Sequence, residues 1–426
     1  MSEPTSPLQI PDYRRFWIAR FLAVFSTLSM VVLIGYQTYD VARADYGMSQ
    51  SAAAFQLGLL GLAQFVPLFF LTPLAGLAAD RFDRRYVGCA SLAFDFLIAL
   101  AMAFFTWTHS LTLPLCFILA AAHGAARVFS GPAMTAIAPN IVPPALLPRA
   151  IAMSSIGFTG GQVTGPALGG LLFAADPTLP YLVSAAMLAV AALSLISIRP
   201  MQPSEASNLH PLRRIADGLT FVWHHRFLLG CISLDLFAVL FAGATALLPV
   251  YARDILHVGA EGLGVMRAAS AVGAGLMALY LSFRPFSQNV GAKMLIAVAI
   301  FGAATAAFGL SRNLLLSLAL LALLGGADMI SVFVRGTLEQ LSTPDAMRGR
   351  VSSLSGLAVS ASNELGEMQS GVAAALLGAT GAVVFGGLGA IVITGLWAWI
   401  FPELRRAKTF APQGLASTTA EKEATQ

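Results

Sequence analysis

The stretch "GLAADRFDRR" (residues 76–85) carries five formal charges directly after an apolar run, 57–79, whose one strongly polar side chain is Gln64. A run of about 20 apolar residues is long enough to cross the hydrocarbon core of a bilayer as a helix. The charges cannot share that environment without a large free-energy cost. We therefore expect residues 76–85 to form a turn at a membrane surface, between two spans.

The composition of the whole chain supports a membrane setting. Of its 426 residues, 57% are hydrophobic and 11% are charged, whereas soluble domains have about 25% charged residues. Disordered chains are poor in the apolar residues that abound here. Strands of a membrane β-barrel would alternate in polarity, and no such alternation is visible. The sequence predicts an all-α polytopic membrane protein.

Apolar runs between polar breaks predict twelve transmembrane helices. Their expected ranges are 16–39, 55–79, 86–107, 111–138, 150–174, 180–198, 227–250, 261–283, 292–310, 313–337, 351–377 and 380–401.

The basic residues sort sharply between the two faces that these spans define. Nineteen of the 25 fall on the face of the two termini, and three fall within spans. The opposite face carries Arg43, Arg253 and Arg312. By the positive-inside rule, both termini are expected in the cytoplasm and the protein in the cell inner membrane. This placement explains the net charge of +4 without a nucleic-acid partner.

The longest break between spans divides the chain into two similar parts. "PPALLPRAIAMSSIG" (143–157) and "TPDAMRGRVSSLSG" (343–356) each show proline, arginine, paired serines and glycine. Such a repeat predicts two six-helix halves related by an axis along the membrane normal. The expected organisation is an N-terminal half, a cytoplasmic linker with an amphipathic helix, a C-terminal half and a disordered cytoplasmic tail, at 1–198, 199–226, 227–402 and 403–426. The linker helix lies either on the membrane surface or on the protein.

The opening stretch has the form G-x-x-x-D-R-x-x-R-R, with Gly76, Asp80, Arg81, Arg84 and Arg85. In form and position it resembles the signature loop of the major facilitator superfamily. The resemblance implies a transporter fold in which this loop takes part in gating. Its arginines would pair with acids and helix C-terminal carbonyls of the opposite half, holding the cytoplasmic side shut while the outer side is open.

The fifth span contains "GFTGGQVTGPALGG" (157–170), in which glycines recur four residues apart. Such spacing lets a neighbouring helix approach at backbone distance. The pattern is similar to the span-five motif of the superfamily's antiporters, which favours export, although a purely structural glycine face is the alternative. The motif positions are Gly161, Gly165, Pro166, Gly169 and Gly170.

Ionisable residues within spans need a partner, a watery cavity or a function. The candidates for proton coupling or substrate contact are Asp95, Arg127, Asp235, Asp328, Glu364 and Glu367. Glu364 and Glu367 lie one turn apart, and like charges at low dielectric favour reversible protonation. The alternative for this pair is a structural ion pair with an arginine.

The remaining polar residues in spans have simpler interpretations. Arg127 begins R-x-x-x-G, similar to the superfamily's span-four element associated with proton coupling. Asp95 and Asp235 are coupling residues or interhelical partners. Arg267 is expected to snorkel to the outer surface. His123 is expected to be a satisfied polar residue, with a role as proton carrier as the alternative. Arg335 and Glu339 form either a local pair or part of the inner gate.

No enzyme constellation is evident in the sequence. The three cysteines show no paired spacing, so we expect neither disulfides nor a metal site, and no nucleotide-binding loop or other cofactor motif appears. "TPDAMRGRVSSLSG" followed by "SNELGE" resembles the branch with siderophore (enterobactin-type) exporters and drug-efflux proteins. We therefore expect a monomeric exporter of a small organic molecule, driven by proton antiport. The alternatives are an importer or uniporter, or a membrane sensor that transports nothing.

Overall fold

A computed structural model describes residues 6–201 and 211–410; the side chains of 79, 80, 136, 211–215, 244, 345, 346, 348, 349 and 353 lie outside this description. The long helices of the first half are α1 (Pro11–Ala44), α2 (Gln50–Arg81), α3 (Arg84–Trp107), α4 (Leu113–Ile141), α5 (Leu147–Ala175) and α6 (Leu179–Ile196). Those of the second half are α8 (Arg226–Phe241), α10 (Gly259–Phe283), α11 (Val290–Leu310), α12 (Leu314–Ser342) and α13 (Asp345–Ile400). Short elements connect them: η1 (Pro7–Gln9), η2 (Pro144–Leu146), α7 (Pro211–His224), η3 (Ala244–Leu247), α9 (Leu248–Val250), η4 (Tyr251–Ile255) and α14 (Pro402–Arg406).

Within the described residues, ten stretches are long and apolar enough to cross a membrane. The helix α5 is not one of the ten because glycine, threonine and glutamine dilute its apolar residues, yet it runs for 29 residues beside α1. The stretch 350–400 is a pair of spans, because Gly378 with φ 72° breaks the helix between them. The chain is thus an all-α polytopic membrane protein with the twelve spans that the sequence predicts.

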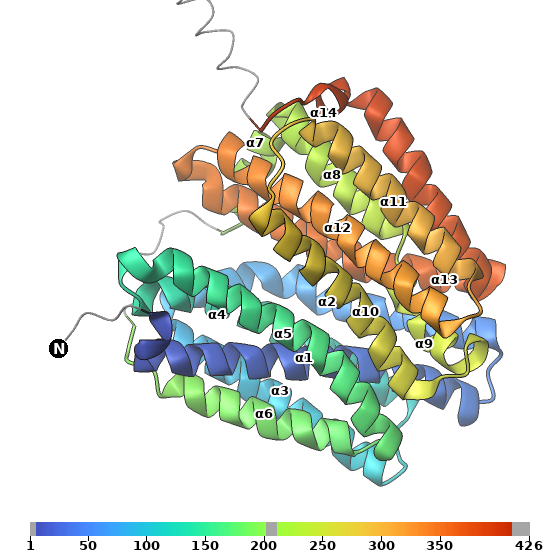
Figure 1. The fold of residues 1–426 in the computed structure, drawn as a ribbon. Helices are drawn as coiled ribbons and strands as arrows, with labels where there is room; N and C mark the ends of the chain where they lie inside the picture. Colours follow the sequence, from blue (N-terminus) through green and yellow to red (C-terminus); the bar gives the residue numbers. More distant parts are fainter. Residues whose placement is uncertain (1–5, 202–210, 411–426) are drawn as a thin grey trace, which may run out of the picture.

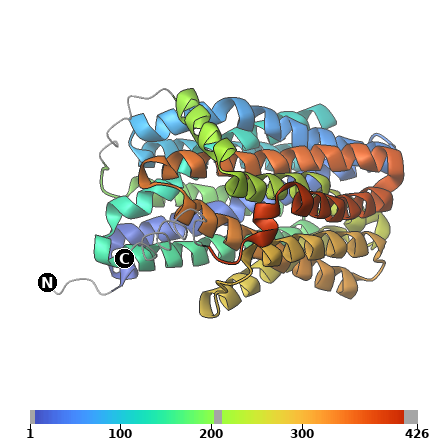
Figure 2. The same ribbon diagram turned by 90° about the horizontal axis from the view of Figure 1, so that it is seen from above.

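The spans form two groups that lean on each other. The helices α1, α3, α4, α5 and α6 pack together in the first half, and α8, α10, α11, α12 and α13 in the second. The two most extensive contacts between the halves are those of α2 with α13 and of α5 with α10. We call the end where α1 begins and α14 lies the termini end, and the opposite one the far end. The two groups of ribbons converge at the far end, near α9, and splay toward the termini end (Figure 1). Seen from above, the ribbons of the two halves overlap (Figure 2).

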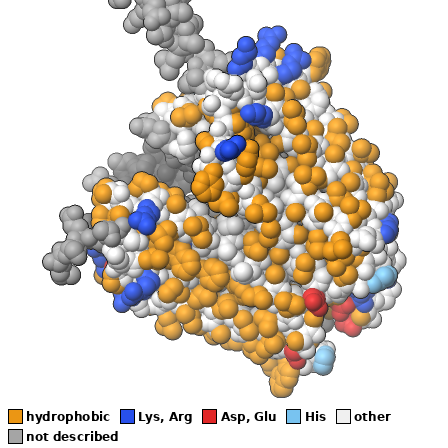
Figure 3. Space-filling view, in the orientation of Figure 1, with side chains coloured by type: hydrophobic (Ala, Val, Ile, Leu, Met, Phe, Trp, Pro, Cys, Tyr) orange, Lys and Arg blue, Asp and Glu red, His pale blue; other side chains and the backbone are white. Residues whose placement is uncertain are grey.

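The surface shows the polarity expected of a membrane protein. Hydrophobic side chains cover the middle of the visible face (Figure 3). Most of the visible Lys and Arg side chains lie toward the termini end, and the visible Asp, Glu and His side chains toward the far end. Exposed aromatic and aliphatic residues such as Phe70, Phe283 and Leu376, with 68%, 78% and 79% of their surface accessible, suit a lipid-facing girdle.

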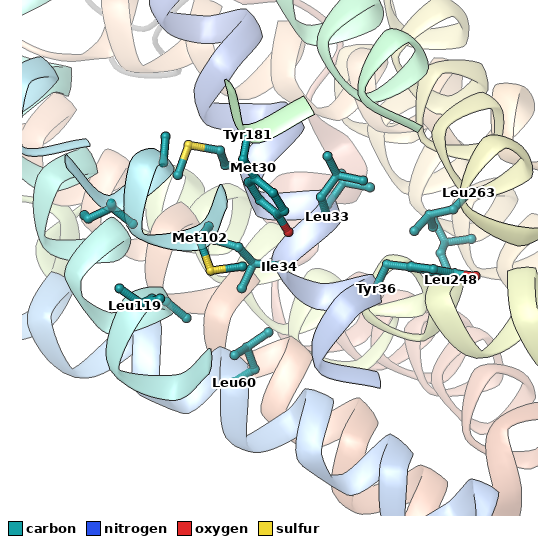
Figure 4. Packing of buried hydrophobic residues seen from close by; sticks show 14 of the residues in the cluster. Met30, Leu33, Ile34, Tyr36, Leu60, Met102, Leu119, Tyr181, Leu248 and Leu263 are labelled. Atoms are coloured by element: carbon teal, nitrogen blue, oxygen red, sulfur yellow. The ribbon is translucent and has the colours of Figure 1, made fainter. Parts of the chain in front are cut away.

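The core of the first half is built around α1. Its side chains Met30, Leu33 and Ile34 are buried beside Met102 and Tyr181 (Figure 4). Further toward the far end, the same helix contacts α9 and α10 of the second half. The helix α1 therefore belongs to the packing of both halves.

Aromatic residues of α1 fill the glycine face of α5. A side chain at Gly157 would meet the Trp17 ring, and one at Gly165 would strike the backbone of Phe25. The spacing of four residues on both helices aligns each bulky residue with a gap one turn long. Of the span-five motif, Gly161, Gly165 and Gly169 thus form the surface on which α1 packs.

Two close glycine contacts hold the halves together. Added side chains at Gly170 of α5 and Gly264 of α10 would collide with the opposing backbone, and so would those at Gly58 of α2 and Gly371 of α13. These pairs lie in the part of each helix nearer to the far end. The halves are therefore in backbone contact there.

The connecting segments differ in part from the expectation. The amphipathic helix α7 lies on the second half, where Val222 is buried with Leu228 and Val351. The tail, expected to be disordered from residue 403, continues as α14 with Leu404 buried, because this leucine packs into the apolar cluster of the second half. Residues 202–210 of the linker and 411–426 of the tail lie outside the described residues.

We predict that Gly165→Ala destabilises the protein because the added methyl group strikes the Phe25 backbone. Overpacking of this kind costs about 1–3 kcal/mol. The matched control is Gly160→Ala on the same helix, whose methyl group would lie at ordinary contact distance, 3.4 Å, from the Phe21 ring. Thermal unfolding of the purified protein in detergent measures the difference. Equal unfolding temperatures for the two variants would contradict the packing argument.

Candidate functional site

An ion pair crosses the contact between the halves in the middle of the bundle. Arg127 of α4 donates from Nη1 to Glu364 Oε1 of α13 at 3.4 Å, and to Gln64 Oε1 of α2 at the same distance. The Glu364 side chain is 8% exposed and that of Arg127 is 31% exposed. Three helices from two halves therefore meet at one guanidinium group. Glu364 thus has an arginine partner, and a role of this pair in proton coupling stays a prediction.

A narrow cavity lies beside this ion pair. It is lined by residues of both halves, including Gln64, Arg267 and Glu367, with apolar walls from Leu57, Leu60 and Leu263. Its volume of about 20 Å³ admits a water molecule but not an organic substrate. One arginine and one glutamate are among the lining residues, so the cavity carries both signs of charge.

Arg267 is placed wrongly by the sequence analysis. It does not snorkel to the surface: it lines the interior cavity with Glu367, and its Nε atom is buried without a hydrogen-bond partner. The reason is that α10 packs against α5 of the first half, so the face that carries Arg267 points between the halves. The hydropathy of the sequence indicates how deep Arg267 lies in the membrane, but it does not show which face of the helix is buried.

Asp95 and His123 form a second buried pair within the first half. The His123 Nδ1 atom lies 2.7 Å from Asp95 Oδ1, and both side chains are almost completely buried. The same helices are joined by Ser91 Oγ, which donates to the carbonyl of Ala126 at 2.7 Å. His123 Nε2 is buried without a partner. Asp95 thus serves as an interhelical partner, and His123 is satisfied at one of its two nitrogens.

A third polar cluster lies inside the second half. Arg335 of α12 lies 3.5 Å from Asp235 Oδ2 of α8 and donates to Ser355 Oγ of α13 at 3.3 Å. Ser355 in turn donates to Glu339. Arg335 and Glu339, expected to form a local pair or part of a gate, both lie on α12 and are connected through Ser355 of α13. Asp328 lies on the same helix α12, one turn before Ser331 and two turns before Arg335. The Ser331 hydroxyl donates to Asp235 Oδ1 at 3.2 Å.

The signature loop makes its described contacts within its own half. The Arg85 guanidinium is 2.7 Å from Asp83 Oδ2 and donates to the carbonyls of Ile196 and Ile198 at the end of α6. These contacts of Arg85 lie at the end where the ribbons of the two halves splay (Figure 1). Pairing of the loop with the opposite half stays a prediction. Arg81 is exposed, and the Asp80 side chain lies outside the described residues. A side chain at Gly76 would meet nothing within 4 Å.

Asp83, which the sequence motif does not include, anchors this loop. Burial raises the pKa of Asp83, but hydrogen bonds from Arg85 and from the Met201 N–H outweigh burial and hold the pKa below its usual value. The loop therefore depends on an ionised Asp83. A second acid three residues after Asp80, directly before the paired arginines, is the sequence signal that could have indicated this role.

Four further residues missed by the sequence analysis join the halves at the far end. Arg253 Nη1 lies 2.6 Å from Asp40 Oδ1, and Arg43 Nε lies 3.1 Å from Asp254 Oδ2. Both pairs connect α1 with η4. The signal is present in the sequence as "YDVAR" (39–43) and "YARD" (251–254), at the ends of the first span of each half.

The chain has the arrangement of a membrane transporter, with two helical halves, a charged contact between them and a cavity at that contact. Comparison with solved structures agrees. A bacterial homologue of the human lysosomal transporter Spinster, inward-facing and occupied, superposes with a TM-score of 0.71 at 15% identity, over 95% of this chain and 100% of that one. A D-xylose–proton symporter gives 0.70 at 13% identity, over 93% and 99% of the two chains. At these identities the likeness concerns the fold alone.

The family follows from the sequence comparison. The profile of the major facilitator family described as "Transmembrane secretion effector" matches residues 2–419, and the chain belongs to this family. Proteins named enterobactin exporter EntS from Citrobacter koseri and Shigella boydii are each 27% identical to it over 377 residues, covering 87% of this chain and 85% of theirs. The protein is therefore a transporter and not an enzyme.

We predict that Asp83→Asn destabilises the protein near neutral pH because Arg85 loses its charged partner. Since the pKa of Asp83 is depressed, this contribution is present above the ordinary value of 3.8 and is lost as the pH falls through the lower folded-state value. Unfolding temperatures of the variant and the parent should therefore converge in acid. Glu261→Gln, at an exposed position of α10, is the control. A gap between variant and parent that persists in acid would contradict the assignment.

Proposed function

We propose that this transporter exports a small organic molecule by alternating access, and that entry of protons drives the export. The observation that carries the proposal is the Arg127–Glu364 ion pair, with Glu367 beside it, at the contact between the halves. An ion pair placed there must change whenever the halves separate.

Protonation is the simplest way to make that change possible. Separating Arg127 from an ionised Glu364 would leave an uncompensated charge in a poorly solvated site, which is strongly unfavourable. A protonated Glu364 carries no charge, so the contact can open without leaving an anion behind. Glu367 lies one turn away and lines the same cavity as Arg267. Binding of a proton and movement of the halves are thus linked through the same carboxyl groups.

The orientation is proposed from charge. The basic residues gather toward the termini end, which the positive-inside rule assigns to the cytoplasm. Both termini are then cytoplasmic, in a multi-pass protein of the cell inner membrane that works as a monomer. The splayed termini end faces the cytoplasm, as is required to accept a substrate for export.

The substrate class is proposed from the relatives. The EntS proteins are named for the export of enterobactin, so a siderophore or a drug-like compound of similar chemistry is the substrate to test first. An importer or a uniporter with the same fold would move solute without requiring the outward direction. A membrane sensor would show no flux at all.

Inverted membrane vesicles that contain the protein test the proposal, with enterobactin as the probe. In inverted vesicles export appears as uptake, and we expect uptake that depends on an inwardly acidic pH gradient and disappears with a protonophore. Glu364→Gln with Glu367→Gln should lower this uptake by at least about tenfold, the range of a lost proton-transfer group. Glu261→Gln, exposed on α10, should leave it unchanged.

Unchanged pH-driven uptake in the double variant would exclude these two glutamates as proton carriers. Enterobactin uptake that ignores the pH gradient would favour a uniporter. If a panel that also includes cationic and neutral drugs gives no flux, transport of this substrate class is excluded.

A further inference from the structure

The far end of the molecule is closed by side chains that form a reciprocal arrangement. The last turns of α1 and the π-helical turn η4 each present one acid and one arginine to the other half. Asp40 pairs with Arg253, and Arg43 pairs with Asp254. The first span of each half thus supplies one acid and one arginine, and each of them pairs with a residue of opposite charge in the other half.

Additional hydrogen bonds fix the geometry of both pairs. The Tyr39 hydroxyl donates to Asp254 Oδ2, the same oxygen that Arg43 contacts. Arg253 also donates to the backbone carbonyl of Asp40 at 3.0 Å, and Arg43 to the carbonyl of Met48 at 2.6 Å. Each arginine is therefore held by a carboxylate and a carbonyl, which favours one orientation of its planar donors.

The burial of these pairs differs from that of ordinary surface ion pairs. The side chains of Arg43 and Asp254 are 31% and 16% exposed, and those of Arg253 and Asp40 are 27% and 44% exposed. Partial burial limits screening by salt. The π-helical turn η4 is a rare departure from α-helical geometry of the kind often found at functional positions, and it carries both Arg253 and Asp254.

Not every arginine at the far end bridges the two halves. Arg312, which also lies at the far end, donates to the carbonyls of Gly309 and Ser311 and to Thr380 Oγ1. All three belong to its own half. Arg312 therefore offers an arginine of matched position that does not bridge the halves.

We infer that the Asp40–Arg253 and Arg43–Asp254 pairs form the gate of the far end, which must part before the outer side opens. The two pairs favour the conformation in which the termini end is splayed, and each breaks when the halves rock the other way. The inference rests on the alternating access of the proposed function, but it concerns the outer gate and not the proton-binding glutamates.

Labelling of a cavity residue from outside the cell tests this gate. Val31 lines the cavity between the halves, so Val31→Cys reports access to it in a background with Cys89, Cys116 and Cys231 replaced by serine. Intact cells are treated with a membrane-impermeant methanethiosulfonate reagent. The rate is normalised to labelling of the same sample after solubilisation in detergent, which corrects for protein amount.

We expect Arg43→Asp and Asp254→Arg each to raise the labelling rate about fivefold or more, since each loses a partly buried pair and sets like charges face to face. The double variant Arg43→Asp with Asp254→Arg restores the pair in reverse and should return to within about twofold of the parent. Asp40→Arg and Arg253→Asp should behave in the same way, alone and together. Arg312→Asp should label like the parent.

Single variants that label at the parent rate would overturn the inference, and so would a charge-swapped double variant that labels as fast as the single variants. If a charge reversal does not reach the membrane, Arg43→Gln and Asp254→Asn give the same comparison without repulsion. If the gate variants label faster while the Glu364 and Glu367 double variant keeps its proton-dependent uptake, the assignment of the glutamates is refuted and the gate is retained. If the gate variants label like the parent while the glutamate variant loses uptake, the gate alone is refuted.

Discussion

The close approach of α2 and α13 brings Glu364 and Glu367 to the contact between the two halves. A side chain at Gly61 would collide with the Cβ of Glu367 and with the carbonyl of Glu364, so glycine is needed for these glutamates to reach the contact between the halves. Once there, Glu364 meets Arg127 from α4, and Glu367 lines the cavity together with Arg267. Small residues thus allow the close approach of the two halves. The charged residues at this contact make its opening energetically costly.

The glycine contacts and the ion pairs have complementary roles in the proposed cycle. Backbone contact at Gly170–Gly264 and Gly58–Gly371 involves no directional side-chain interaction, so the helices can pivot there while they remain packed. The ion pairs at the centre and at the far end are directional and must break or form as the halves move. This division lets a change of only a few charges shift the balance between two packed arrangements.

The sequence predicts the fold well and the site in part. Twelve apolar runs and one asymmetry of basic residues suffice for the spans because a bilayer imposes length and forbids unpaired charge. The candidate residues Arg127, Glu364 and Glu367 come together as neighbours of one contact. Arg267 could not be predicted, because the direction in which a helix face points depends on packing between halves. The two ion pairs at the far end could not be predicted either, because the spacing of residues within one span does not show which two spans meet.

The central claim is that proton binding moves two rigid halves in opposite senses at the two ends of the bundle. Spin-label distances measured at both ends in lipid nanodiscs test it most directly, with one pair at Tyr46 and Glu261 of the far end and another at Ser197 and Gln288 of the termini end, all four exposed. When the pH is lowered from about 8 to about 5, the direction that favours protonation of carboxylates, we expect the far-end distance to lengthen and the termini-end distance to shorten. Distances that stay constant, or that change in the same sense at both ends, would contradict the account.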